Sequence, residues 1–380
     1  MKVWIVNPFD TLPAEGARPL RFWLMAEAFA KAGHDVVFWT ADFNHVTKRR
    51  REFLSAPSLP VRLVHAPPYS SNVSFRRLWS HWRWAKAWAA AAKEEPSRPD
   101  LVVASSPPLS SACEAVRFAR GCGARAVVDL MDAWPDTFKR VLPRPLHFLL
   151  APLERLSRRT LREADAVTAV SRRFLDIAEE CGGGKPARLF YHGIALGPAA
   201  RKTGGGGLRI VYAGNLGVTY DLATAMEAVA TVDGATLSIA GAGTNEGLLR
   251  KLAREPRFAG KISFAGLLDG AELRDFLEKA DIGVIPMRPE SCVGVPYKLA
   301  DYAAASLAVV SSLGGESAKL LAEYGAGVEY RPGDPASLAA ALRRLASVLP
   351  EAKRASRRLA EERFDAARIY SAYVDFATSV

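Results

Sequence analysis

Residues 289–312 read PESCVGVPYKLADYAAASLAVVSS. A loop that contains Gly294 and Pro296 leads into a segment with helical spacing, and the apolar run that follows is typical of a strand. Lys298 and Asp301 are three positions apart, so a helix places both on one face of its first turn. The cation could pair with a diphosphate, and the carboxylate could accept two ribose hydroxyls. A surface ion pair worth less than about 1 kcal/mol explains the same spacing.

The sequence AGNLG (213–217) lies upstream, between an apolar run and the helical run LATAMEAVA. Glycines in a strand–helix turn let backbone N–H groups approach a phosphate at the helix N-terminus. A tight turn without any ligand explains this short pattern equally well.

Around these motifs, short apolar runs alternate with helical segments through the second half of the chain. The predicted strands are 208–214, 235–241, 261–267, 281–287 and 307–312. The first half shows the same alternation of apolar runs and helical segments. Its predicted strands are 3–8, 35–40, 61–67, 100–106, 125–130 and 166–171. Continuous apolar strands between helices predict parallel sheets covered on both faces.

Two glycine runs, at 182–184 and 204–207, separate the halves and indicate a linker. The length of 380 residues also favours two domains. We therefore predict an α/β protein with two doubly wound, Rossmann-like domains, 1–185 and 186–363, and a C-terminal helix at 364–380 that packs back on the first domain. Ligands of open α/β sheets bind at the carboxyl ends of the strands, so we expect the site in a cleft between the domains.

Bulk composition narrows the class of protein. Apolar residues make up 49% of the chain, which excludes disorder, and the net charge of +11 favours a polyanionic partner or a phosphorylated substrate. The four cysteines are scattered, which fits reduced thiols better than disulfides or structural zinc. The apolar N-terminal run is too short for a signal peptide, and no run is long enough to span a membrane. We expect a cytoplasmic protein.

Taken together, the motifs resemble glycosyltransferase family 4 within the GT-B fold, especially its members from bacterial polysaccharide assembly. The resemblance rests on AGNLG after a strand, on GVPYKLADY followed by AAASLAVVSS, on GHDVVFWT, and on VVDLMDAWPDTF. It covers nearly the whole chain. It implies a retaining glycosyltransferase that moves a sugar from a UDP- or GDP-sugar to a membrane-associated glycolipid or oligosaccharide in polysaccharide biosynthesis, without a protein nucleophile or a required metal ion.

The resemblance also implies roles for single residues. Asn215 and Gly217, with Gly214 beside them, match the loop that touches the donor diphosphate. Asp301 matches the acidic residue that binds the ribose, and Lys298 matches a lysine near the pyrophosphate. Gly294 and Val295 match positions whose backbone amides meet the distal phosphate and the donor sugar. Gly16 matches the glycine that lets the N-terminus of the first helix approach donor and acceptor.

This chain departs from the family pattern in two places. The first glutamate of the E-x7-E motif would fall at Val293, so Glu290 is the nearest substitute. The basic pair that usually follows the glycine loop is missing from VTYDLA, and Arg288 or Lys298 could supply that charge. Our candidate catalytic residues are therefore Lys298, Glu290 and Asp132.

Asp132 is a candidate on the acceptor side because DLMDAWPD follows a predicted strand and so lies at its carboxyl end. A helix cap or an ordinary loop carboxylate is an equal alternative. His192, in YHGI, is a weaker candidate, since a lone histidine beside a strand is more often structural.

The segment FRRLWSHWRWAKAW (75–88) combines aromatic residues and cations. As a helix, it would turn Trp79 and Trp82 toward the sheet and leave Trp84 and Trp88 outside, beside Arg77. Indoles beside cations suit a membrane–water interface, and a basic run (Lys48, Arg49, Arg50) lies in the same half. We therefore expect peripheral attachment to an anionic membrane surface on the inner face of the cell membrane. The alternative is that both faces are buried, or that Trp84 and Trp88 contact the acceptor or neighbouring loops.

Two other functions fit parts of the pattern. A basic nucleic-acid-binding protein could use the tryptophans for stacking, but no known nucleic-acid signature is present, so we expect no nucleic-acid partner. Another GT-B enzyme, such as a sugar-nucleotide epimerase or a phosphorylase, would share the fold. Phosphorolysis would need a pyridoxal-binding lysine site, which the sequence does not reveal.

Overall fold

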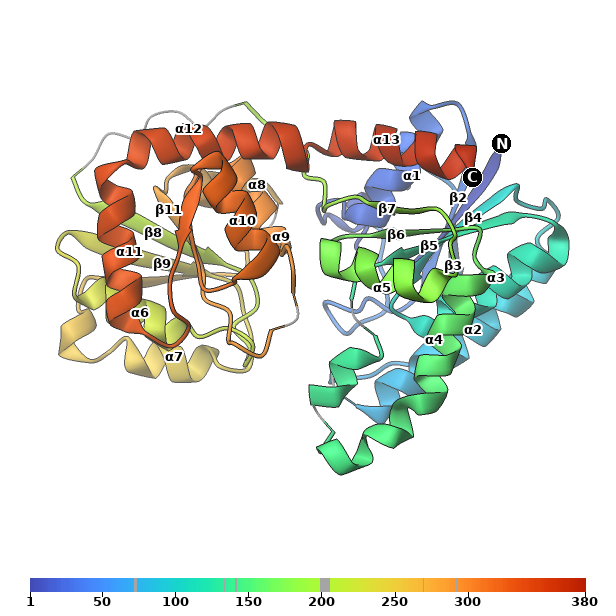
Figure 1. Ribbon diagram of the computed structural model, residues 1–380, viewed down its shortest axis with the longest axis horizontal. Helices are drawn as coiled ribbons and strands as arrows, with labels where there is room; N and C mark the ends of the chain where they lie inside the picture. The colour runs from blue at the N-terminus through green and yellow to red at the C-terminus, as the bar shows by residue number, and fades with distance from the viewer. Residues whose placement is uncertain (72–73, 133, 141, 199–205, 269, 292) are drawn as a thin grey trace. The chain divides into compact units, whose positions relative to one another are not determined.

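The computed structural model describes residues 1–71, 74–132, 134–140, 142–198, 206–268, 270–291 and 293–380. It divides into two compact units (Figure 1). Unit 1 comprises Met1–Gly193 and Ala367–Val380, and unit 2 comprises Ile194–Ala366. Each unit is a doubly wound α/β domain, which confirms the predicted fold class.

In the described residues, unit 1 holds a seven-stranded parallel sheet in the order β3-β2-β1-β4-β5-β6-β7. Its strands are β1 (Lys2–Val6), β2 (Asp35–Ala41), β3 (Val61–Val64), β4 (Leu101–Ser106), β5 (Arg125–Leu130), β6 (Ala166–Ala169) and β7 (Ala187–Leu189). The strand order reverses beside β1, and ligands of open α/β sheets bind at such switch points.

Helices cover both faces of this sheet (Figure 1). The helices and 3-10 turns are η1 (Pro13–Glu15), α1 (Arg21–Lys31), α2 (Phe75–Glu94), α3 (Leu109–Cys122), η2 (Asp136–Arg140), η3 (Arg144–Leu150), α4 (Ala151–Glu163) and α5 (Arg172–Gly182). Trp4 and Val6 of β1 face α2 to α5, whereas α1 covers the opposite face. The alternating side chains of one buried strand thus contribute to two separate core layers.

Helix α2 corrects the predicted orientation of the tryptophans. Trp84 and Trp88 are 1% and 0% exposed, and Trp88 packs edge-on against Trp39 and Phe118. The expectation that these two indoles face a membrane is therefore wrong. The reason is length: α2 continues to Glu94, so Trp84, Trp88 and Ala92 form one stripe along the helix that reaches the sheet.

The opposite stripe of α2 is exposed. Phe75 is 89% exposed, Trp79 51% and Trp82 49%. Arg77, expected beside outward tryptophans, lies instead against the Phe9 and Trp134 rings, at 5.8 and 5.4 Å from their centroids.

The basic run that follows β2 has mixed surroundings. Arg49 and Arg50 are exposed, and Arg50 pairs with Asp42 at 2.5 Å. Lys48 is half-buried, and its ammonium lies 4.7 Å from the Tyr69 ring centroid. One of these three cations is thus directed against an aromatic ring of unit 1.

The last helix, α13 (Ala366–Ser379), contributes to unit 1 beside α1. Tyr373 packs edge-on against Phe29 and lies 3.3 Å from the Thr168 hydroxyl. Thr168 also donates to Asp129, which pairs with Arg21 at 2.8 Å in full burial. A buried ion pair is tolerated in a core only when further hydrogen bonds satisfy its remaining polar atoms, and Thr168 supplies such a bond to Asp129.

Unit 2 repeats the architecture with a six-stranded parallel sheet in the order β10-β9-β8-β11-β12-β13 among the described residues. Its strands are β8 (Leu208–Ala213), β9 (Ala235–Ala240), β10 (Ile262–Gly266), β11 (Ile282–Ile285), β12 (Ala308–Ser311) and β13 (Gly327–Glu329). The order reverses between β8 and β11, which places the AGNLG loop at the switch point.

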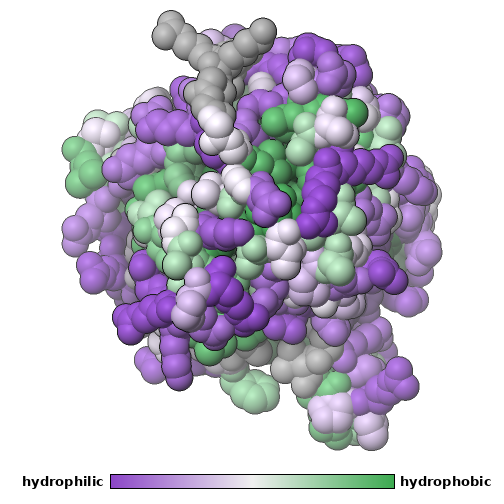
Figure 2. Space-filling view, turned by 90° about the vertical axis from the view of Figure 1, so that its left-hand side faces the viewer, coloured by the Kyte–Doolittle hydropathy of each residue, from purple (hydrophilic) through white to green (hydrophobic). Residues whose placement is uncertain are grey.

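The helices of unit 2 are amphipathic and close the two faces of its sheet. They are α6 (Leu222–Ala230), α7 (Glu246–Leu252), η4 (Pro256–Phe258), α8 (Gly270–Glu278), α9 (Tyr297–Ala304), α10 (Gly315–Tyr324), α11 (Pro335–Ser347), α12 (Leu349–Leu359) and η5 (Ala360–Phe364). Figure 2 shows one side of this unit, where hydrophilic side chains surround the hydrophobic atoms visible between them. Among the described residues, no helix is both long and apolar enough to cross a membrane.

Candidate functional site

Two glycine loops meet at the carboxyl ends of β8 and β9. The Gly214 N–H donates to Ala240 O, and the Leu216 N–H donates to Ala242 O, both at 2.9 Å. Gly241 has a φ of +128°, and a Cβ there would lie 1.8 Å from Gly214 O. Only glycine permits this approach, so backbone rather than side chains forms this edge of unit 2.

Lys298, in the first turn of α9, lies directly on this edge. Its Nζ is 4.2 Å from the Tyr220 ring centroid and 5.1 Å from the Tyr212 centroid. A Cβ on Gly214 would come within 2.3 Å of the same Nζ. The half-buried ammonium thus lies against two aromatic faces, which attract a cation.

Tyr302 ties α9 to the glycine loop. Its buried hydroxyl accepts the Ala213 N–H at 3.0 Å and donates to Val284 O at 3.3 Å. Burial raises the pKa of Tyr302 well above its usual value, so this phenol stays neutral and can donate. A Cβ on Gly283 would lie 2.3 Å from the ring, so glycine in β11 makes room for it.

Asn215 and Gly217 are brought together within the loop itself. A Cβ on Gly217 would lie 2.7 Å from the Asn215 Oδ1, so the carboxamide covers that glycine. The Asn215 carbonyl accepts the Tyr212 hydroxyl at 2.6 Å. The side chains of Asn215 and Tyr212 thus hold the loop in place, and Asn215 itself is exposed.

The loop between β11 and α9 is anchored at two points. The Arg288 N–H donates to Thr219 O at 3.0 Å, and the Ser317 hydroxyl donates to Gly294 O at 2.5 Å. Val295 is buried. Glu290 is exposed, and in the described part of the chain no hydrogen bond or ion pair joins it to Lys298.

Asp301 lies half-buried on α9, three residues after Lys298. Unit 2 therefore brings together four of the residues singled out in the sequence (Gly214, Asn215, Gly217, Lys298), and it carries four more on α9 or the preceding loop (Glu290, Gly294, Val295, Asp301).

The remaining two candidates, Asp132 and Gly16, belong to unit 1. The Asp132 carboxylate accepts the Thr137 hydroxyl at 3.1 Å, just beyond the end of β5. Gly16 ends the turn η1 with a φ of 76°, a left-handed conformation that favours glycine.

Unit 1 also holds two buried titratable side chains, Asp10 and His192. Asp10 accepts the Phe22 and Trp23 N–H groups at 2.7 and 3.3 Å, which occupies the start of α1. Burial raises the pKa of Asp10 to about 6. His192 is also buried, and burial together with Arg21 and Arg18 holds its pKa well below the usual value.

Sequence reasoning missed three tyrosines of this site: Tyr212, Tyr220 and Tyr302. Tyr302 closes the motif KLADY, and Tyr220 lies in VTYD, where basic residues were sought instead. Their contacts with Lys298 and Ala213 join positions 78 to 89 residues apart, which a single sequence does not reveal. In the described residues, no group of three or more His, Cys, Asp or Glu side chains is placed to hold a metal ion.

Two protein families match the chain. The "Glycosyl transferase 4-like domain" matches residues 20–193, and "Glycosyl transferases group 1" matches residues 207–347. The glycogen synthase of Mycobacterium tuberculosis is 34% identical over 207 residues, which is 52% of this chain and 49% of the relative. The chain thus spans about half the length of the curated relative that it matches.

Solved structures share the fold over the whole chain. Sucrose-phosphate synthase from Thermosynechococcus elongatus superposes with a TM-score of 0.76 at 14% identity, covering 100% of this chain and 98% of that one. HepE of Anabaena in complex with UDP gives 0.71 at 14% identity, with full coverage of both chains. WaaG, a glycosyltransferase involved in lipopolysaccharide biosynthesis, gives 0.67 at 14% identity, again with full coverage.

Proposed function

Because the chain belongs to the GT-B glycosyltransferases, with a 4-like domain followed by a group 1 domain, we propose that it transfers a sugar from a nucleoside diphosphate donor to a saccharide acceptor with retention of configuration. The observation that carries this proposal is the position of Lys298, whose ammonium lies against Gly214 in the glycine loop after β8. Structures similar in fold were solved with UDP and with UDP-glucose, which supports a uridine donor.

The proposed chemistry follows from where charge develops. As the sugar leaves, negative charge grows on the β-phosphate, and a fixed cation stabilises that charge more in the transition state than in the bound donor. Lys298 takes this role, with backbone at Gly214, Asn215 and Gly217 alongside the diphosphate. The departing phosphate helps to deprotonate the acceptor hydroxyl, so no protein nucleophile is required.

The other residues of α9 and its loop receive roles by position. Asp301 accepts the ribose hydroxyls, and the backbone at Gly294 and Val295 faces the distal phosphate and sugar. Glu290 is exposed in the same loop and could reach the donor sugar. In unit 1, Asp132 serves the acceptor, and Gly16 permits the turn before α1.

We further propose that unit 1 attaches to an anionic membrane that carries the acceptor. The exposed stripe of α2 (Phe75, Trp79, Trp82) supports this proposal, since aromatic side chains interleaved with cations suit the membrane–water interface. Arg76 and Arg83 are exposed on the same helix. A second apolar group (Leu146, Phe148, Leu149) is exposed on η3, at the same end of unit 1 as the start of α2 (Figure 1).

The donor proposal is tested by nucleotide binding and by turnover of the Lys298→Met variant. We expect UDP to raise the melting temperature of the wild type, because a ligand that binds only the folded state stabilises it. Lys298→Met should lower kcat by about 100-fold or more while UDP affinity falls less than tenfold. Failure of UDP, GDP and other nucleoside diphosphates to bind would refute the proposal.

The membrane proposal is tested by co-sedimentation with vesicles with and without an anionic lipid. Trp79→Ala/Trp82→Ala should lose most of the binding to anionic vesicles. The control is Leu248→Ala/Leu267→Ala, which removes two exposed leucines from unit 2 and should bind as the wild type does. Equal loss in both double variants would contradict a specific docking face on α2.

A further inference from the structure

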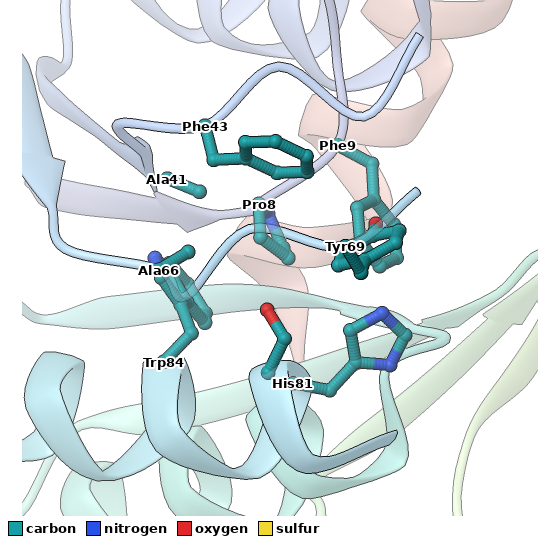
Figure 3. Close-up of a pocket in the computed structure, with 9 residues that line it drawn as sticks. Pro8, Phe9, Ala41, Phe43, Ala66, Tyr69, His81 and Trp84 are labelled. Atoms are coloured by element: carbon teal, nitrogen blue, oxygen red, sulfur yellow. The ribbon is translucent and has the colours of Figure 1, made fainter. Parts of the chain in front are cut away.

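Aromatic side chains surround a space at the carboxyl edge of each sheet, but the two spaces differ in what they hold. In unit 1, α2 and the loops after β1, β2 and β3 enclose a small hollow with nearly apolar walls, among them Phe43 and Trp84 (Figure 3). In unit 2, the rings of Tyr212 and Tyr220 flank the ammonium of Lys298 instead. The first space is a gap between packed side chains, whereas the second encloses a charged group.

The ammonium of Lys298 has protein on three sides. Its Nζ lies 4.2 Å from the Tyr220 ring centroid and 5.1 Å from the Tyr212 centroid, and these two rings are 5.5 Å apart. Gly214 forms the third side, since a Cβ there would lie 2.3 Å from Nζ. A lysine side chain is flexible and loses conformational freedom when it is held, so these contacts limit where its charge can lie.

The backbone on both sides of Tyr220 is fixed by hydrogen bonds. Tyr220 forms an antiparallel bridge with Met287, which joins the loop after β8 to the loop after β11. The N–H groups of Asp221 and Arg288 donate across the two segments at 2.7 and 3.0 Å. The Asp221 carboxylate also accepts the Thr224 N–H at 3.2 Å and so caps α6. The ring of Tyr220 therefore projects from a rigid part of the loop.

The contacts of Lys298 leave its charge without a counterion from the protein. Among the residues that the structure describes, no carboxylate forms an ion pair with Lys298, and its ammonium contacts two rings and a glycine. An aromatic face attracts a cation through its quadrupole but carries no net charge. A carboxylate in the same place would instead offset the positive charge that a leaving diphosphate requires.

We propose that Tyr220 is a positioning residue for Lys298, whose ammonium its ring keeps over the glycine loop where the diphosphate departs. This inference rests on the proposed function of Lys298. A cation that is fixed before the reaction stabilises the developing charge without first having to reorganise. Because this charge is larger in the transition state than in the bound donor, displacement of the ammonium lowers kcat more than it changes KM.

The first test measures the position of the ammonium without any turnover. Reductive methylation places 13C-methyl groups on the lysines, and the Lys298→Met variant identifies the Lys298 signal by its loss. Nuclei above a ring face are shielded, so we expect this signal upfield of the other lysines in the wild type. Tyr220→Phe keeps the ring and should keep the shift. Tyr220→Leu should move the signal toward those of the other lysines.

The second test measures kinetics, with UDP-glucose as the probe and water as the acceptor of the glucosyl group. Tyr220→Leu should lower kcat for UDP release by about tenfold, the scale of one desolvated cation–π contact, while KM changes less than about twofold. Tyr220→Phe should stay within about twofold of the wild type, because it retains the aromatic face. If Tyr220→Leu does not fold, Tyr220→Met takes its place.

The matched control is Tyr324→Leu, at the end of α10. Tyr324 is also a half-buried tyrosine of unit 2, and it lies over two cations, Arg358 and Arg363, at 6.0 and 5.9 Å. Its replacement removes the same kind of contact away from the glycine loop. The Lys298 signal should not move in this variant, and kcat should change less than about twofold.

A double variant separates positioning from a general effect on the loop. If Tyr220 acts through Lys298, Tyr220→Leu/Lys298→Met should be no slower than Lys298→Met. Additive losses, equal losses in Tyr220→Phe and Tyr220→Leu, or an unshifted Lys298 signal in the wild type would each overturn the inference. Failure of the wild type to bind UDP and to cleave UDP-glucose would contradict the donor function instead, and the Lys298 signal would still show whether Tyr220 fixes the ammonium.

Discussion

At the scale of single residues, Lys298 and Gly214 depend on each other. The glycine leaves room for the ammonium, and Tyr220 and Tyr212 flank it. The spacing of PYKLADY was enough to single out Lys298. The tyrosine rings around it could not be predicted, because β8, its loop and α9 bring them together only in the folded chain.

Gly214→Ala should therefore act through Lys298. The added methyl would lie 2.3 Å from Nζ at a φ of 141°, so either the lysine or the loop must shift. We expect kcat to fall by about tenfold or more, and the Gly214→Ala/Lys298→Met double variant to be no slower than Lys298→Met alone. Additive losses in this double-mutant cycle, measured by UDP release, would show that the two positions act independently.

Asp10 should make the stability of unit 1 depend on pH. Its pKa is raised from 3.8 to about 6 in the folded state, so the folded state binds more protons than the unfolded chain between these values. The free energy of unfolding should fall as pH rises through this window, by roughly 3 kcal/mol in total.

The Asp10→Asn variant should lack this dependence while it keeps an acceptor for the Phe22 N–H. The measurement is urea unfolding of both proteins between pH 4 and pH 7, followed by tryptophan fluorescence. A constant difference between the two proteins across this range would contradict the raised pKa.

At the scale of elements, the sequence determines strands better than helix faces. The run RAVVDL predicts 125–130, and β5 spans the same residues. The edge strands β7 and β13 were missed because each has only three residues and both contain partly exposed positions. Helix α2 was predicted from its spacing, but its inner face was wrong because two apolar stripes compete within 75–88 and only the full helix to Glu94 decides between them.

The two stripes of α2 should differ sharply in their effect on stability. Trp88→Ala removes a fully buried indole, and we expect the free energy of unfolding of unit 1 to fall by about 3–5 kcal/mol. Trp82→Ala removes a half-exposed one and should cost less than about 1 kcal/mol. Both values come from urea unfolding, and similar losses would contradict the assignment of the inner face.

At the scale of the whole molecule, the two units differ in composition as well as in connection. All eight tryptophans lie between positions 4 and 134, hence in unit 1. Tryptophan fluorescence therefore reports on unit 1 alone. The doubly wound fold of both units follows from the alternation of apolar runs. The side-chain partners that join distant segments, such as Tyr373 of α13 with Phe29 of α1, leave no periodic signal in the sequence.

Removing the anchors of α13 should destabilise only unit 1. Tyr370 accepts the Gly193 N–H at 3.1 Å, and Tyr373 packs on Phe29 and Phe190. Because both side chains are buried, Tyr370→Ala/Tyr373→Ala should lower the free energy of unfolding of unit 1 by several kcal/mol. Tryptophan fluorescence should show this as a lower unfolding midpoint. Hydrogen exchange should show unchanged protection for peptides of unit 2. Loss of protection in β8 or β11 would mean that the units unfold as one.

The discontinuity of unit 1 also bears on the order of events on the ribosome. The chain leaves unit 1 at Gly193 and returns only at Ala367, so the part of α13 that belongs to unit 1 is synthesised after every residue of unit 2. Domains generally fold as units during translation. Here unit 2 can complete its folding before unit 1 does, although the synthesis of unit 1 begins earlier. Until then the face of α1 where Phe29 contacts Tyr373 stays exposed. Nascent chains that stall before α13 would leave this apolar surface exposed, and we expect chaperones to bind it.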